Sequence, residues 1–166
     1  MTSPENLFIL LSSASLCILA LCVKNIPWHK LGLKPKPWWG GVILVSIFSL
    51  LVFIVVQTSI QFFDLPSWVT DKDPILKLLV IVVLQELIFR GLLITWLERW
   101  GKQKALWIST IVFAAIHLFL PSPLLMTGLS LIVGYFWGWH FLKYRNIYWI
   151  IISHLIVNLS FNYLVF

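Results

Sequence analysis

The chain has 166 residues, of which 60% are hydrophobic and only 11% are charged, and its mean hydropathy is +0.96. A soluble domain carries about 25% charged residues, so this composition is typical of a protein that crosses the membrane several times. It excludes a separate soluble domain, a large catalytic head outside the membrane, and intrinsic disorder. The net charge of +6 does not indicate nucleic-acid binding, because the basic residues lie between apolar runs, where they set topology and meet anionic lipid head groups.

Six apolar runs follow one another along the chain, separated by breaks that contain Pro, Asp or Lys. A membrane-spanning helix needs about 20 residues, and each run is predicted to cross once. We therefore expect an all-α polytopic membrane protein with six transmembrane helices in one bundle, forming a single domain over residues 1–166. The predicted spans are Asn6–Val23, Gly41–Phe63, Pro74–Leu97, Ala105–Leu120, Pro123–Leu142 and Ile147–Phe166.

The connections between these runs alternate in charge. The first, third and fifth are basic, whereas the second carries Asp64, Asp71 and Asp73. Because Lys and Arg in short loops are retained in the cytoplasm, we predict an integral protein of the plasma membrane with both termini on the non-cytoplasmic side. The basic positions are Lys24, Lys30, Lys34, Lys36, Arg99, Lys102, Lys104, Lys143 and Arg145.

Ionisable and amide side chains lie inside three of the predicted spans. Glu86 and Arg90 are four residues apart on one helical face, His154 and Asn158 have the same spacing, and His117 lies on a third helix. Such groups are costly in hydrocarbon and indicate a functional site, although ion pairing or interhelical hydrogen bonding would also explain them. Apart from Arg90, they fall about 10–18 Å below the basic interface. We therefore predict one shared water-filled pocket.

Other polar or small residues receive structural interpretations. His29 and His140 each follow a tryptophan near the basic side, and we predict that both lie at the membrane interface. Small residues in the fifth span predict close approach of a neighbouring helix. They are Gly128, Gly134 and Gly138.

Three motifs follow one another in the second half of the chain. They run from Gln85-Glu86 to Arg90, from Phe113 to His117, and from His154 to Asn158. In this order they resemble the Glu-Glu-x-x-x-Arg, Phe-x-x-x-His and His-x-x-x-Asn motifs of the CPBP (Abi) family of intramembrane proteases, which includes the type II CAAX prenyl endopeptidases. The resemblance covers about Leu79–Asn158, and we expect a family-like core over about residues 74–166.

The resemblance implies proteolysis within the membrane. In such enzymes a glutamate and the histidine of the second motif activate water for attack on a peptide carbonyl, while the last histidine and asparagine stabilise the oxyanion. The implied partners are a membrane-anchored peptide or protein substrate and the lipid bilayer. No nucleic-acid partner is expected, and the sequence makes no prediction about the oligomeric state. The implied catalytic residues are Glu86, His117, His154 and Asn158, with Gln85 and Arg90 in support.

One position departs from the family pattern. Gln85 stands where the family has its first glutamate, which usually activates the water. A carboxamide can orient water, but it offers no basic oxygen that takes a proton at neutral pH. Either Glu86 and His117 supply the base between them, or the chain is a non-catalytic relative that uses the pocket to bind a partner helix or a lipid.

A zinc site is the alternative to metal-free chemistry. Glu86, His117 and His154 would form a His₂Glu set with a position open for water, which catalytic zinc uses. Against this, the sequence has no His-Glu-x-x-His pairing and reveals no acid that would support either histidine. We therefore expect no metal and no other cofactor, with zinc as the alternative.

Overall fold

The computed structural model describes residues 26–33, 39–63, 75–119 and 123–163. Every regular element within these ranges is helical, which confirms the all-α class. The predicted span Asn6–Val23 lies outside the described residues. The elements are α2 (Trp39–Phe63), α3 (Ile75–Glu86), the π-helix η1 (Leu87–Ile94), α4 (Thr95–Leu97), the 3-10 helix η2 (Glu98–Trp100), α5 (Lys102–Ala115), the 3-10 helix η3 (Ile116–Phe119), α6 (Pro123–Tyr144) and α7 (Ile147–Tyr163).

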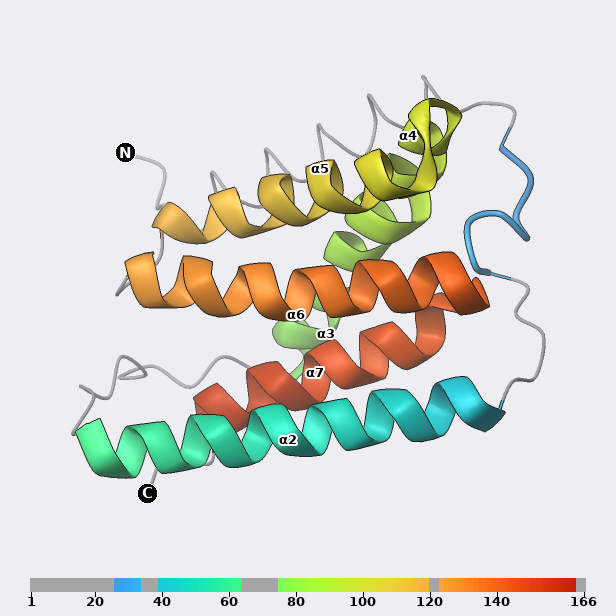
Figure 1. Cartoon of the computed structure of the whole chain (residues 1–166). Helices are drawn as coiled ribbons and strands as arrows, with labels where there is room; N and C mark the ends of the chain where they lie inside the picture. The colour runs from blue at the N-terminus through green and yellow to red at the C-terminus, as the bar shows by residue number, and fades with distance from the viewer. Residues whose placement is uncertain (1–25, 34–38, 64–74, 120–122, 164–166) are drawn as a thin grey trace.

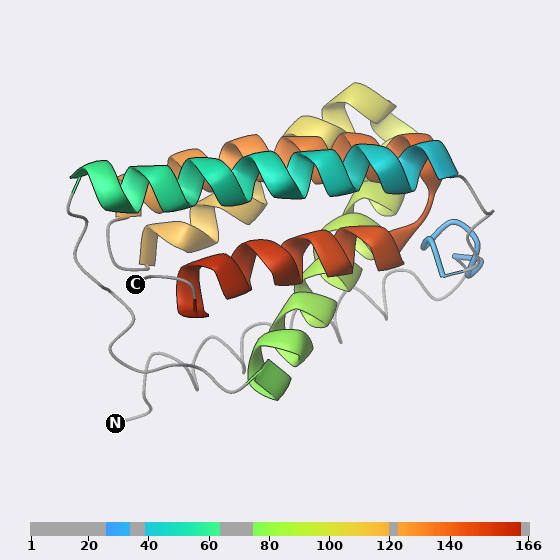
Figure 2. The ribbon, with the colours of Figure 1, turned by 90° about the horizontal axis from the view of Figure 1, so that it is seen from below.

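The helices form a bundle in which one member crosses the others. In Figure 1, α5, α6, α7 and α2 succeed one another in that order, and α5 packs on α6 while α2 packs on α7. The α3 helix crosses them at a steep angle (Figure 2), and its continuation η1 packs against α5. This crossing brings the α3–η1 boundary next to the middle of α6 and α7.

Apolar side chains cover the outside of the bundle as well as its centre. The core contains Phe113, Trp137 and Phe141, all fully buried. Large apolar side chains are also exposed on every long helix, where a water-soluble monomer rarely shows extended apolar patches. These outward residues include Ile47, Leu51, Val80, Ile111, Ile132 and Ile152. The outer surface is therefore suited to contact with hydrocarbon.

Two helical stretches in the described part of the chain are long and apolar enough to cross a membrane, Ile75–Trp100 and Leu124–Tyr144. Gly41–Val55 and Ile147–Ser160 are apolar but shorter. The α5 helix has 14 residues and begins at a lysine, so it falls short of a full crossing on its own. By this measure the structure supports two spans, where the sequence predicts six.

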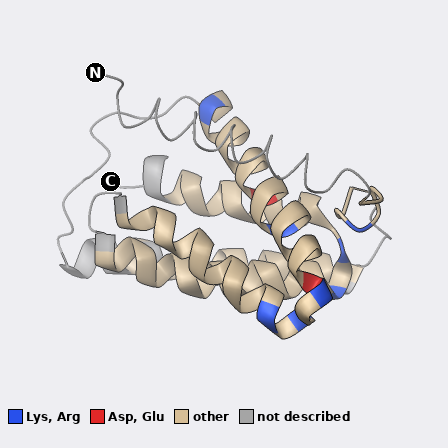
Figure 3. Cartoon of the chain, turned by 90° about the horizontal axis from the view of Figure 1, so that it is seen from above, with Lys and Arg blue, Asp and Glu red and all other residues tan. Residues whose placement is uncertain are grey.

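Most of the charged residues in the described part of the chain lie at one end of the bundle (Figure 3). Arg145, in the turn between α6 and α7, donates a hydrogen bond to the Lys30 carbonyl oxygen at 3.1 Å and forms an ion pair with Glu98. Its φ of 49° is uncommon for a residue with a side chain, and these two contacts hold the turn in that conformation. They also join three of the basic connections, in agreement with a shared interface.

Close helix approach occurs at two of the three predicted glycines. A Cβ at Gly138 would lie 2.6 Å from Cδ1 of Leu106, and one at Gly134 would lie 2.9 Å from Cδ1 of Phe113. Both neighbours belong to α5, so small residues in α6 let the two helices approach closely. At Gly128 the prediction is wrong for the described part of the chain, where no atom would lie within 4 Å of the added Cβ.

Candidate functional site

The helix that carries the first motif changes its winding directly after Glu86. There α3 ends and the π-helix η1 (Leu87–Ile94) begins. The buried hydroxyl of Ser109 on α5 donates a hydrogen bond of 2.8 Å to the Phe89 carbonyl oxygen within this segment. A π-helix is wider than an α-helix and is frequent at functional sites. Arg90 lies in this wider segment, on the side that faces the interior of the bundle, and it is 1% exposed.

Glu86 is the centre of a buried ionic cluster. Its Oε1 lies 3.2 Å from Nη1 of Arg90, which confirms the predicted pair, and 2.6 Å from Nδ1 of His154. Nη2 of Arg90 donates to the carbonyl oxygen of Gly134 at 3.3 Å, and the guanidinium lies 4.2 Å from the ring centroid of Phe113. The carboxylate thus has a permanent positive charge on one side and an imidazole on the other.

His154 is oriented by contacts on two sides of its ring. Nδ1 donates its proton to the Glu86 carboxylate, because an ionised carboxylate can only accept. One face stacks on the indole of Trp137, with 4.4 Å between centroids and 29° between planes, and Phe113 approaches edge-on at 5.8 Å. In a neutral imidazole, donation from Nδ1 leaves the lone pair on Nε2. The contact with Glu86 therefore selects one tautomer of the neutral ring, and the two aromatic contacts orient its plane.

His117 has the same tautomer for a different reason. It lies in η3, where α5 tightens into a 3-10 turn, and its Nδ1 is 2.9 Å from the carbonyl oxygen of Phe113. A carbonyl oxygen can only accept, so Nδ1 is the donor and Nε2 has the lone pair. Phe113 thereby connects the two imidazoles, through its backbone to His117 and through its ring to His154.

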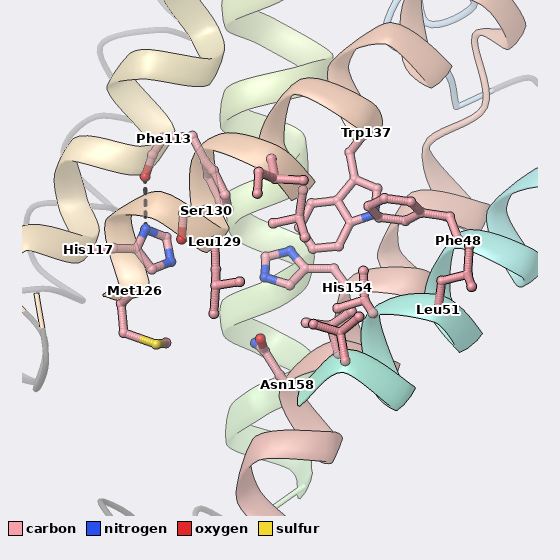
Figure 4. Close-up of a pocket in the computed structure, with 15 residues that line it drawn as sticks. Phe48, Leu51, Phe113, His117, Met126, Leu129, Ser130, Trp137, His154 and Asn158 are labelled. Atoms are coloured by element: carbon pink, nitrogen blue, oxygen red, sulfur yellow. Dashed lines mark hydrogen bonds between the residues drawn. The ribbon is translucent and has the colours of Figure 1, made fainter. Parts of the chain in front are cut away.

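A cavity of about 300 Å³ lies where α2, α5, η3, α6 and α7 meet. His117, His154 and Asn158 line it together (Figure 4), and the hydroxyl of Ser130 adds a fourth polar group. The remaining wall is mainly apolar, and α2 contributes Phe48, Leu51, Val52 and Val55. An apolar cavity with a few convergent polar groups is the usual form of a ligand site.

The structure separates the predicted site residues into two groups. His117, His154 and Asn158 line the cavity, whereas Glu86 is 0% exposed and lies behind His154, outside the lining. Gln85 is also buried and outside the lining, and its carboxamide makes no hydrogen bond within the described part of the chain. Glu86 is therefore the acid that supports His154, and the sequence alone did not reveal this pairing.

Sequence reasoning missed several polar contributors. His140, which is predicted to lie near the membrane interface, is buried within the bundle: it is 0% exposed, and its Nε2 lies 3.0 Å from the carbonyl oxygen of Gly41 near the start of α2. That burial depends on the contact between α2 and α6, which periodicity does not predict. Ser130 and Trp137 were also missed. Their spacing could have indicated them, because Ser130 lies four residues before Gly134 and Trp137 three residues after it, which places all three on one face of α6.

The donor set does not fit a zinc ion. No three His, Cys, Asp or Glu side chains in the described ranges are grouped so that they could hold a metal. In addition, the guanidinium of Arg90 already contacts Oε1 of Glu86, and a cation beside it would be repelled.

An apolar outer surface around histidine, asparagine and glutamate side chains inside a helical bundle is typical of a membrane protein with a polar site among its helices. Residues 73–160 match the family model described as Type II CAAX prenyl endopeptidase Rce1-like. The match covers just over half of the chain, and the chain belongs to this family. No curated protein and no solved structure matches it. Family membership and the two long apolar helices together indicate an integral membrane protein.

Proposed function

We propose that the chain is an intramembrane endopeptidase that hydrolyses a peptide bond in a membrane-anchored protein or peptide. The contact between Glu86 and His154 supports this proposal most directly, because a carboxylate on Nδ1 turns the imidazole into a directed base. Packing between helices does not require this arrangement, in which the opposite ring nitrogen can accept a proton and the ring lines a cavity. The family to which the chain belongs is described by endopeptidase activity.

The first step of the proposed reaction is attack by water. Nε2 of His154 accepts a proton from the water while its oxygen bonds to the peptide carbonyl carbon, and Glu86 stabilises the imidazolium that forms. His117 accepts a hydrogen bond from the same water through Nε2 and so orients it. This assignment differs from direct activation by Glu86, which the family resemblance implies, because Oε1 of Glu86 already contacts both His154 and Arg90.

The second step is collapse of the tetrahedral intermediate. The carboxamide N–H of Asn158 donates a hydrogen bond to the carbonyl oxygen as it becomes negative, and the apolar wall strengthens this interaction. The carbon–nitrogen bond then breaks, and the imidazolium of His154 returns its proton to the leaving amine. The immediate products are a carboxylic acid and an amine, and transfer of the acid's proton to the amine then gives a carboxylate and an ammonium group, so atoms and charge balance without a further reactant.

The proposed substrate follows from the cavity wall and the family description. The apolar side chains of α2 suit a segment that lies in the membrane, and a prenylated protein is the first substrate to test because the family is one of prenyl endopeptidases. We further propose that α2, α5 with η3, and α7 also cross the plasma membrane, as the prediction of six spans requires; the first of its runs, Asn6–Val23, lies outside the described residues. The end that carries Arg145 then faces the cytoplasm, and both termini face outward.

The proposal is tested with the purified protein in liposomes that contain membrane-anchored peptides, with and without a prenyl group. We expect the wild type to cleave at least one class and His154→Ala to lose more than about 100-fold in rate. His29→Ala is the matched control, since His29 is exposed near the basic end. Equal rates in wild type and His154→Ala would refute the assignment of His154.

One observation favours the non-catalytic alternative, in which the cavity binds a partner helix or a lipid. Gln85 replaces the family's first glutamate and makes no hydrogen bond within the described residues. Gln85→Glu separates the two functions. If the wild type is inactive and the variant cleaves, the chain is a binding protein that has lost its catalytic acid, whereas an active wild type excludes this alternative.

A further inference from the structure

Three hydrogen bonds join α2, α7 and α6 in a buried chain. Nε1 of Trp137 lies 2.9 Å from Oγ of Ser153, which lies 2.6 Å from Oγ of Ser49, which in turn lies 2.8 Å from the Val45 carbonyl oxygen. The two hydroxyls and the indole are at most 3% exposed. Each bond except the last joins two different helices, so the chain connects the membrane-facing helix α2 to the interior of α6.

The chemistry of the two ends determines the direction of every bond. An indole N–H can only donate, so Ser153 accepts from Trp137, and a carbonyl oxygen can only accept, so Ser49 donates to Val45. Ser153 must then donate its hydroxyl hydrogen to Oγ of Ser49. All four groups are satisfied in a single arrangement, and a chain with one direction strengthens each of its members.

The indole at the end of this chain is the surface on which His154 stacks, 4.4 Å between centroids. The bond from Nδ1 to Glu86 limits rotation of the imidazole about its Cβ–Cγ bond, but it restrains movement of the ring out of its own plane less well. A stationary indole face restrains that movement and so helps to aim Nε2 at one position in the cavity. Orientation of a catalytic base to within a fraction of an ångström has large effects on rate.

We propose that Ser49 and Ser153 are positioning residues, which hold Trp137 so that its face orients the imidazole of His154. The expected effect on kcat rests on the proposed peptidase function, whereas the orientation of His154 by Trp137 does not depend on it. Ser49 belongs to α2, and α2 precedes the residues 73–160 that define the family match. A helix outside the family-defining segment thus contributes to the geometry of the base.

Another buried serine shows what a merely structural hydroxyl does in the same helix. Ser160 lies seven residues after Ser153 in α7 and donates to the carbonyl oxygen of Ile156 in its own helix at 2.8 Å. Ser153 instead bonds across helices on both sides. Ser160→Ala is therefore the matched control, since it removes a buried hydroxyl from α7 without touching Trp137 or His154.

The experiment combines kinetics with nitrogen-15 spectra of the intact protein in micelles, with labelled tryptophan and histidine assigned through Trp137→Phe and His154→Ala. Ser153→Ala should move the Trp137 indole signal and the His154 ring signals, and Ser49→Ala should move them less, because Ser153 can still accept. With peptides in liposomes, Ser153→Ala should lower kcat about five- to tenfold with KM changed less than twofold. Ser153→Thr, which keeps the hydroxyl, should restore both readouts.

The outcomes separate this inference from the proposed function. An inactive wild type would refute the peptidase proposal, and the His154 signals would still decide the positioning role. His154 signals that do not move in Ser153→Ala would overturn the inference, and so would a kcat loss that Ser160→Ala reproduces. A loss that appears in KM instead of kcat would likewise contradict positioning of the base.

Discussion

Oε1 of Glu86 and Nδ1 of His154 lie 2.6 Å apart, although 68 positions separate the two residues in the chain. The contact joins the first and the last of the three sequence motifs across the crossing of α3 and α7. It gives the buried acid a partner and gives the cavity histidine one tautomer.

Arg90 should contribute strongly to stability, because its removal leaves Glu86 buried without its opposite charge. We expect Arg90→Ala to lower the free energy of unfolding by about 3–5 kcal/mol, measured by reversible unfolding in bicelles. Arg99→Ala is the control: Arg99 is exposed over the rings of Trp96 and Trp100, and its loss should cost less than about 1 kcal/mol. Similar losses in both variants would contradict the buried pair.

Asn158 should act in the chemical step and not in substrate binding. Asn158→Ala should lower kcat about 10²–10³-fold with little change in KM, measured on anchored peptides in liposomes. Asn158→Asp should not restore the rate, because an ionised carboxylate has no hydrogen to donate. Met126→Leu, in the same cavity wall, serves as the control. Recovery of activity in Asn158→Asp would exclude the oxyanion role.

Gly134 and Gly128 lie on the same helix and should respond differently to alanine. At Gly134 the new methyl group would press on the ring of Phe113, which packs against Arg90 and both site histidines. We expect Gly134→Ala to lose about 1–3 kcal/mol of unfolding free energy and Gly128→Ala to lose none. Thermal unfolding in detergent distinguishes the variants, and an unaffected Gly134→Ala would show that Phe113 can move freely.

Metal removal should leave peptidase activity unchanged. The guanidinium beside Glu86 opposes a cation at that carboxylate, so dialysis against a strong chelator should not alter the cleavage rate, and added zinc should not raise it. Rates measured before dialysis, after it and after zinc addition provide the comparison. Activity that disappears with the chelator and returns only with zinc would establish a metal site and reject the histidine base.

The helices were largely predictable from the sequence, because apolar runs end where Pro, Gly or charge begins. The run Gly41–Phe63 became α2 (Trp39–Phe63), and the start of α6 at Pro123 and of α7 at Ile147 fell on the predicted residues. The widened segment η1 was not predictable, since no local residue signals it. The Ser109 hydroxyl that bonds within η1 comes from α5 and arrives only when the bundle packs.

The site was predictable in its members but not in its layout. Helical spacing put His154 and Asn158 on one face, and both line the cavity. Spacing could not tell that Glu86 turns toward His154 instead of the cavity, because this depends on the crossing angle of α3 and on the π-helix after it. The buried His140 and the Ser49–Ser153–Trp137 chain depend likewise on contacts of α2, which helical periodicity cannot pair with a partner.

The most direct test of the account is a double-mutant cycle on cleavage of an anchored peptide by wild type, Glu86→Gln, His154→Ala and the double variant. If Glu86 acts through His154, Glu86→Gln slows cleavage, and the double variant is no slower than His154→Ala alone, because groups that act as a unit are not additive. Losses that multiply in the double variant would show that Glu86 acts independently of His154 and would contradict the proposed mechanism.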